Sequence, residues 1–405
     1  MGIAHLIDEH FAPRGNWQGL SPGRPTAVWL GHILSGGDHR LSQVRLWAAT
    51  RLETLAACLG QPVRELDFSD DRLALVLTAF GDDRRGVPFE AALNGQILRV
   101  YDLNAGRVRV DSTTVSGYWK VSEDGLFQFG HSQDHAARGQ PQIKVMLSAL
   151  DPLGMPVVTQ VVPGHRCDDP LSIPAIRPVR ESLGRSGLLY VGDSKMLARE
   201  TRAFVQAGGD FYLGPLSKVQ VPDEILETYF EPVWQGEQPV EPVDRTQPDG
   251  TSKVIAEGYE RAERMRIVVD DRTVTWTERR LVIRSVGQAK AHQAALQTRL
   301  TTAQAEVEAL NEHTPGKKIY REVAPMQAHV ETILKRHKVT GLVAVAYDRR
   351  ELITSPKGKP KPVVVVQVAR DEAAIQRAEA WLGWRVYATN HPQGSLSWPK
   401  GTRCR

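Results

Sequence analysis

The feature that most constrains the fold is the stretch VRVDSTTVSGY at residues 108–118. Apolar Val108 and Val110 alternate with basic residues, which is the period-2 pattern of a half-buried strand. This strand runs directly into Asp111 and three hydroxyl residues. A carboxylate in this position is suited to binding a hard cation.

A second stretch, LLYVGDSKM, has the same design, because an apolar run over residues 188–191 precedes Gly192 and Asp193. Two aspartates at strand ends favour a metal-dependent phosphoryl-transfer site. The local pattern also allows structural roles, with Asp111 as a turn residue and Asp193 as a helix N-cap.

Composition indicates a soluble globular protein with two or three domains, since the 405 residues are 41% hydrophobic and 24% charged. Its three cysteines form no paired motif, which argues against a disulfide framework or a zinc site. No apolar run approaches the roughly 20 residues of a membrane span. Because the N-terminal stretch is acidic, we expect no signal peptide and a cytoplasmic location.

Charge is unevenly distributed along the chain. Residues 1–100 hold ten arginines and eleven acidic residues, whereas residues 315–405 hold seventeen basic and seven acidic residues. The basic excess near the C-terminus favours a polyanionic partner such as nucleic acid. A solvated basic face is the alternative.

The expected organisation begins with a helical domain over residues 1–100, with helical patterns at 26–34, 41–59, 73–80 and 88–100. This domain is either a helix-turn-helix-like DNA-binding module or a helical cap on the core. Residues 101–215 alternate strands and helices, with strands expected at 108–115, 125–130, 143–150, 155–162, 188–193 and 211–214 and helices at 173–183 and 196–207.

Residues 216–380 are expected to form an insertion domain, with an exposed linker at 240–250 and short strands at 265–269, 273–276 and 281–283. A long helix is predicted at 289–310, and its apolar seam favours packing on its own chain over a dimerising coiled coil. Further strands at 342–347 and 363–368 flank a basic loop. Residues 381–405 form a return strand and a tail.

Five stretches carry a family resemblance: LDFSDDRLA, RVRVDSTTVSGY, KVMLSALDPLG, YVGDSKM and WRVYATN. In this order they resemble bacterial insertion-sequence transposases of the DDE type, in the subgroup that has a large β-rich insertion in the catalytic core. The resemblance implies an α/β fold with an RNase H-like mixed sheet and flanking helices, preceded by a helical N-terminal domain and interrupted by a β-rich and helical insertion.

The resemblance also implies a function, namely DNA strand cleavage and strand transfer with Mg²⁺ or Mn²⁺ bound by Asp111 and Asp193. The implied partners are double-stranded DNA, as insertion-sequence ends and target, and a second copy of the chain, in the bacterial cytoplasm at the nucleoid. Candidate DNA contacts are the basic residues near Asp193 and in the basic loop: Lys195, Arg199, Lys357, Lys359 and Lys361.

The sequence departs from the family at the third carboxylate, a glutamate expected on a helix after Asn390. The chain runs instead through LSWPKGTRCR, and the other glutamates lie too early. We therefore expect a C-terminally truncated, catalytically inactive transposase. Two alternatives stay open: a non-catalytic DNA-binding protein that inhibits the full-length enzyme, and a nuclease that draws a third acid from its own chain.

Overall fold

The computed structural model describes residues 2–13, 15, 17–131, 139–269, 271–312, 317–352 and 360–392. The chain divides into two compact units. The first is built mainly from Met1–Pro215, with Arg264–Thr277 and Thr389–His391, and the second mainly from Leu216–Glu263 and Glu278–Ala388.

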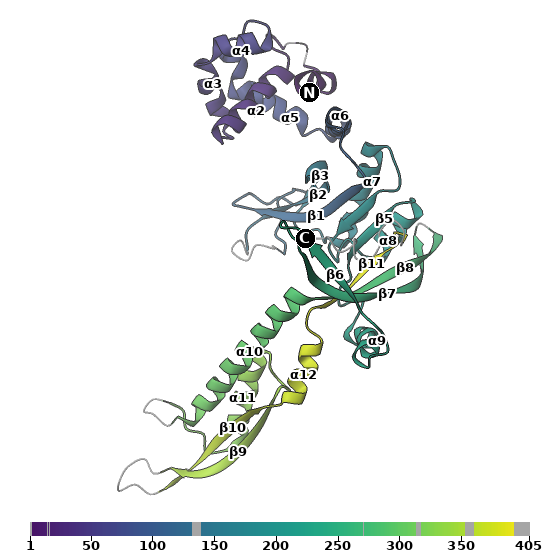
Figure 1. Ribbon diagram of the computed structural model, residues 1–405. Helices are drawn as coiled ribbons and strands as arrows, with labels where there is room; N and C mark the ends of the chain where they lie inside the picture. Colours follow the sequence, from purple (N-terminus) through teal and green to yellow (C-terminus); the bar gives the residue numbers. More distant parts are fainter. Residues whose placement is uncertain are drawn as a thin grey trace. The chain divides into compact units, whose positions relative to one another are not determined.

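The first hundred residues, where described, are helical as predicted (Figure 1). Apolar residues at helical spacing bury one face of each helix, and Leu20, Val28, Val44, Phe68 and Leu73 form a shared core. The α-helices here are α1 (Ile3–His10), α2 (Gly23–Gly36), α3 (Leu41–Ala49), α4 (Leu52–Leu59), α5 (Asp70–Phe80) and α6 (Asp83–Tyr101).

The single helix predicted at residues 41–59 is two helices, α3 and α4. The Thr50 hydroxyl and the Arg51 guanidinium both donate to the Trp47 carbonyl, at 3.2 and 2.8 Å. These side chains occupy an acceptor at the C-terminal end of α3, which favours termination there. The end of α4 agrees with the sequence, because Gly60 adopts the left-handed conformation with φ of 67°.

A mixed sheet organises the rest of the first unit. Its order is β3-β2-β1-β4-β5, with β1 antiparallel to β2, β2 antiparallel to β3, and β4 parallel to both β1 and β5. This confirms the predicted α/β fold with its RNase H-like mixed sheet. The strands are β1 (Arg107–Ser116), β2 (Gln142–Leu150), β3 (Met155–Pro163), β4 (Leu189–Gly192) and β5 (Phe211–Pro215).

Two helices accompany this sheet. Helix α7 (Ser172–Leu183) contacts β1, β2 and β3 and buries Ala175, Ile176 and Val179. Helix α8 (Arg199–Ala207) contacts β5 and begins three residues later than predicted, because the chain just before it forms a turn. The strand predicted at 125–130 is absent, since these residues make only an isolated bridge between Gln128 and Gln142.

The second unit contains a β-rich part with its own core, which includes Tyr229, Phe230, Val282 and Val386. The predicted short strands at 265–269, 273–276 and 281–283 belong to two long ones. The elements are α9 (Asp223–Trp234), β6 (Glu241–Thr246), β7 (Ser252–Val269), β8 (Arg272–Ser285) and β11 (Trp384–Thr389). The end of β7 and the start of β8, within Arg264–Thr277, and the last residue of β11 are assigned to the first unit.

The prediction of an exposed linker at residues 240–250 was wrong in part. Strand β6 occupies most of this stretch and pairs antiparallel with β7. Strand β6 is the last in the order β11-β8-β7-β6. An edge position tolerates Pro242, and Val243 is buried although its neighbours are exposed. The local sequence of residues 240–250 does not predict a strand, because the strand forms only by pairing with β7 across a turn that contains Pro and Asp.

The remaining elements of the second unit form a helical and β-hairpin module, which we define as residues 286–382. Its core confirms that the predicted seam packs on its own chain: Leu296, Leu300, Ala303 and Val307 are buried with residues of the following helix and hairpin. The elements are α10 (Val286–Glu308), α11 (Val323–His337), β9 (Val343–Leu352), β10 (Lys361–Arg370) and α12 (Glu372–Ala380) (Figure 1).

Within the described residues, none of the helices combines the length and the apolar character needed to span a membrane.

Candidate metal centre

Asp111 and Asp193 lie next to each other because of strand register. Parallel strands β1 and β4 pair Val110 with Gly192, and each aspartate is the next residue along its chain. Both aspartates are exposed. Asp193 directly follows the end of β4, as predicted, but Asp111 lies inside β1, which continues to Ser116, so it is neither a strand-end nor a turn residue. The register nevertheless brings together two carboxylates that are far apart in the sequence.

Gly192 allows this close approach. A Cβ atom at this position would lie 2.5 Å from the Met196 Sδ and 3.0 Å from the Val110 carbonyl oxygen. The backbone of β4 therefore runs so close to β1 and to the following turn that only glycine fits without displacement. The glycine fixes where Asp193 leaves the sheet.

Asp193 organises the turn after β4. Its Oδ1 accepts from the backbone N–H groups of Lys195 and Met196, at 3.0 and 3.2 Å. Asp193 is not the N-cap of a helix, because α8 begins only at Arg199. Its Oδ2 accepts no hydrogen bond from the described residues, so one carboxylate oxygen is open to a ligand.

One oxygen of the Asp111 carboxylate also accepts a backbone hydrogen bond. Its Oδ1 accepts from the Ser112 backbone N–H at 2.8 Å, and its Oδ2 takes no hydrogen bond from the part of the chain that is described. Asp111 alternates with Val110 along β1, so it faces away from the buried side of the strand. The two aspartates thus present open oxygens, and no ion pair from the described residues neutralises them.

A lysine–aspartate–lysine cluster, formed by Lys144, Asp168 and Lys195, adjoins this pair. Asp168 Oδ1 accepts from Lys144 and its Oδ2 accepts from Lys195, the second residue after Asp193. Lys144 also donates to the Arg166 carbonyl at 2.6 Å and is buried. The cluster ties the turn that carries Asp193 to strand β2.

The pKa of the Asp168 carboxyl reflects these contacts. Burial raises it, but the hydrogen bonds and positive charges of Lys144 and Lys195 outweigh burial, so the pKa lies below its ordinary value. Asp168 therefore stays ionised at a lower pH than an ordinary aspartate does. Sequence reasoning missed this residue, because its partners lie 24 and 27 residues away and no local motif joins them.

The described residues contain no group of three or more His, Cys, Asp or Glu side chains arranged to hold a metal ion. Two glutamates of the second unit, Glu260 and Glu278, are already paired with arginines and are not candidates for a third ligand. Glu278 is fully buried and pairs with Arg280 at 2.8 Å, and Glu260 pairs with Arg279 at 2.6 Å. The geometry of the described residues thus provides two carboxylates at this site.

The predicted DNA contacts fall in different places. Lys195 is half-buried in its ion pair with Asp168, and Arg199 is exposed at the start of α8. Lys361 is exposed at the start of β10, in the second unit. Lys357 and Lys359 lie outside the described residues.

The donor set fits a small hard cation. Mg²⁺ is bound in proteins through one or two carboxylates and keeps several waters, so two open Oδ2 atoms are an appropriate minimum. Asp111 and Asp193 would hold the ion. A bound divalent cation supplies a Lewis acid and lowers the pKa of bound water.

No family model and no curated protein matches the sequence. Among solved structures, the chain is similar to a piggyBac transposase synaptic complex with hairpin DNA, at 9% identity and a TM-score of 0.30, covering 70% of this chain and 54% of that one. It thus spans about half of the piggyBac chain.

Two Mos1 transposase structures are also similar. The paired-end complex with the left transposon end gives 11% identity and a TM-score of 0.19, covering 49% of this chain and 60% of that one. The strand transfer complex gives 13% identity and a TM-score of 0.20, covering 55% and 67%.

Proposed function

We propose that this chain is a DNA-transposition protein of the DDE type, specific for the ends of an insertion sequence, with Asp111 and Asp193 as ligands for Mg²⁺ or Mn²⁺. The observation that carries the proposal is the register of β1 and β4, which sets the two aspartates side by side. Both side chains keep one oxygen free of hydrogen bonds from the described residues. An acidic pair of this kind is the simplest Mg²⁺ site for phosphoryl transfer.

The chemistry of the proposed site is incomplete with two carboxylates. Phosphoryl transfer depends on electrostatic stabilisation of charge in the transition state, so the loss of one metal ligand removes much of the rate. The described residues supply no third acid at this position. We therefore infer that the chain binds a divalent cation weakly and does not cleave DNA on its own.

Lys195 and Arg199 are the proposed phosphate contacts beside the metal. Lys195 shares Asp168 with Lys144, so its ammonium is held near the turn that begins at Asp193. Arg199 is exposed four residues further on. Positive charge beside a metal site favours a phosphate backbone through release of counterions.

A non-catalytic role is the second candidate, and the two-carboxylate site favours it. A chain that binds insertion-sequence ends without cutting them competes with an intact enzyme for the same DNA. This role needs the DNA contacts but not the metal, so the two candidates differ in what Asp111 contributes.

The test uses the full chain and the DNA that flanks its coding sequence on each side. Gel-shift assays with flanking and shuffled DNA measure specific binding, and the same mixtures with Mg²⁺ or Mn²⁺ measure strand cleavage. We expect specific binding, no cleavage above background, and unchanged metal-free binding in Asp111→Asn. Equal binding to flanking and shuffled DNA would contradict the transposition proposal. Metal-dependent cleavage that is lost in Asp111→Ala would support the site but refute the inferred inactivity.

A further inference from the structure

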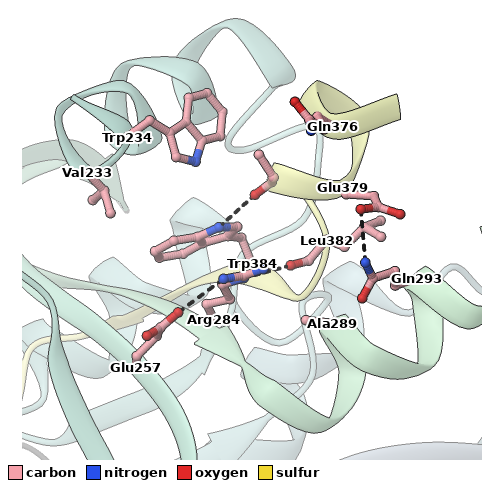
Figure 2. A pocket seen from close by; sticks show the side chains of 11 residues that line it. Val233, Trp234, Glu257, Arg284, Ala289, Gln293, Gln376, Glu379, Leu382 and Trp384 are labelled. Atoms are coloured by element: carbon pink, nitrogen blue, oxygen red, sulfur yellow. Dashed lines mark hydrogen bonds and ion pairs between the residues drawn. The ribbon is translucent and has the colours of Figure 1, made fainter. Parts of the chain in front are cut away.

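The second unit contains a cavity of about 330 Å³ that is separate from the aspartate pair. Its walls come from the end of α9, from β7 and β8, from the start of α10, and from α12 and β11. The volume lies at the lower end of the range of small-molecule sites. Figure 2 shows the indole rings of Trp234 and Trp384 toward one side, and Glu379 with Gln293 toward the other.

The aromatic wall is part of a larger ring cluster. The Trp384 ring stacks on Phe230 with centroids 4.8 Å apart, and Trp234 and Trp381 pack around the same phenylalanine. The Trp384 indole N–H donates to the Ala380 carbonyl at 3.0 Å, which fixes the ring in its plane. Trp234 is 41% exposed, so part of its ring is accessible to a ligand.

One negative charge in the cavity, that of Glu379, has no cationic partner among the residues that the structure describes. Glu257 pairs with Arg284 at 3.2 Å, so these two charges compensate each other. Glu379 instead accepts from the neutral amides of Gln293 and Gln297, at 2.9 and 2.8 Å (Figure 2 draws the first). No ion pair from any described residue reaches Glu379.

The indole rings and the Glu379 carboxylate together favour an organic cation as the ligand. An organic cation gains from indole faces, which attract positive charge, and from a carboxylate with lone pairs still available. An anion would be repelled by Glu379, and a neutral apolar ligand would strip water from the carboxylate without replacing its hydrogen bonds. A hard metal ion requires more oxygen ligands than indoles and amides provide.

We propose that this cavity binds an alkyl guanidinium or ammonium group, with Glu379 as its counter-ion and the Trp234 and Trp384 indoles as its cation–π partners. The lining residues include neither proposed metal ligand, and the proposal does not depend on the proposed DNA chemistry. The group can come from a free small molecule or from an arginine or lysine side chain of a peptide.

Isothermal titration calorimetry of the full chain tests the proposal with L-argininamide as the probe. L-citrullinamide is the matched control ligand, because it has nearly the same shape without the positive charge. We expect argininamide to bind at millimolar or lower concentration and citrullinamide not to bind. Equal heats for both ligands, or no heat with argininamide, would overturn the proposal.

Variants then locate the site. Glu379→Gln should weaken argininamide binding by about tenfold or more, since a charged hydrogen bond is lost. Glu372→Gln is the matched control, because Glu372 is exposed on the same helix and does not line the cavity. Trp234→Ala should also weaken binding. If Glu379→Gln melts like the wild type and binds argininamide equally well, the assignment fails.

A comparison of ligands separates the two sources. A short capped peptide with one central arginine is titrated beside argininamide, and the same peptide with citrulline is its control. Tighter binding of the arginine peptide assigns the cavity to a protein segment, and weaker binding assigns it to a small cation. Binding of the citrulline peptide with equal affinity would contradict both assignments.

Discussion

Asp111 and Asp193 are neighbours across two parallel strands, each one residue beyond the register pair of Val110 and Gly192. Their proximity depends on the backbone of β4 approaching β1 closely. The glycine before Asp193 therefore sets the point at which Asp193 leaves the strand.

Gly192→Ala should displace the turn that carries Asp193, because the new Cβ atom would meet the Met196 side chain at 2.5 Å. We expect a loss of about 1–3 kcal/mol in the free energy of unfolding, the usual cost of overpacking, together with weaker Mn²⁺ binding. Urea denaturation and metal titration measure the two effects. Gly287→Ala, in helix α10, is the control, because a Cβ atom added there would have no neighbouring atom within 4 Å. A Gly192→Ala protein with unchanged stability and metal affinity would refute the close-approach argument.

Asp168→Asn should lower the free energy of unfolding by about 3 kcal/mol at neutral pH, since it leaves the buried Lys144 ammonium without its counter-charge. Urea denaturation measures this loss, with the exposed Asp124→Asn as control. Adding Lys144→Met should recover part of the stability, because no unpaired buried charge then remains. If the Asp168→Asn, Lys144→Met double variant is less stable than Asp168→Asn alone, the unpaired Lys144 charge is not the cause of the loss.

The difference in the free energy of unfolding between the wild type and Asp168→Asn should depend on pH in one direction. The folded pKa of Asp168 lies below the ordinary 3.8, so its ion pairs stabilise the fold fully above that pH and the contribution is lost as the pH falls through the folded pKa. The difference in stability between wild type and Asp168→Asn should therefore shrink only below about pH 4. Denaturation series across the acid range test this, and a difference that already vanishes near pH 6 would be inconsistent with it.

Leu300→Ala should destabilise the module of residues 286–382 by about 2–5 kcal/mol, because Leu300 is fully buried against α11 and the hairpin. The loss should be the same at low and high protein concentration, since the seam packs within one chain. Denaturation midpoints at two concentrations measure it, with Thr298→Ala on the exposed face as control. Midpoints that rise with concentration would indicate an intermolecular seam.

Much of the fold could be predicted because local patterns agree with tertiary burial. The alternation of Val108 and Val110 predicted β1, and the spacing of Leu296, Leu300 and Val307 predicted α10 with its packed seam. These features follow from periodicity. The pairing of β1 with β4 does not, because Asp111 lies inside β1, and the sequence implied this pairing only through the family resemblance.

Other features depend on contacts that no local pattern encodes. Strand β6 exists because β7 pairs with it, despite Pro242. The lysine–aspartate–lysine cluster joins β2, the loop before α7 and the turn after β4, so its three members look like ordinary surface charges in the sequence. The cavity beside Glu379 is assembled from six elements in the same way.

The central claim is that Asp111 and Asp193 together hold one divalent cation, and Mn²⁺ titration followed by electron paramagnetic resonance tests it most directly. Free aqueous Mn²⁺ gives a signal that bound Mn²⁺ does not. The account predicts weak binding by the wild type, at least about tenfold weaker binding by Asp111→Asn and by Asp193→Asn, and no change in Asp124→Asn. Equal Mn²⁺ affinity in the wild type and both site variants would contradict it.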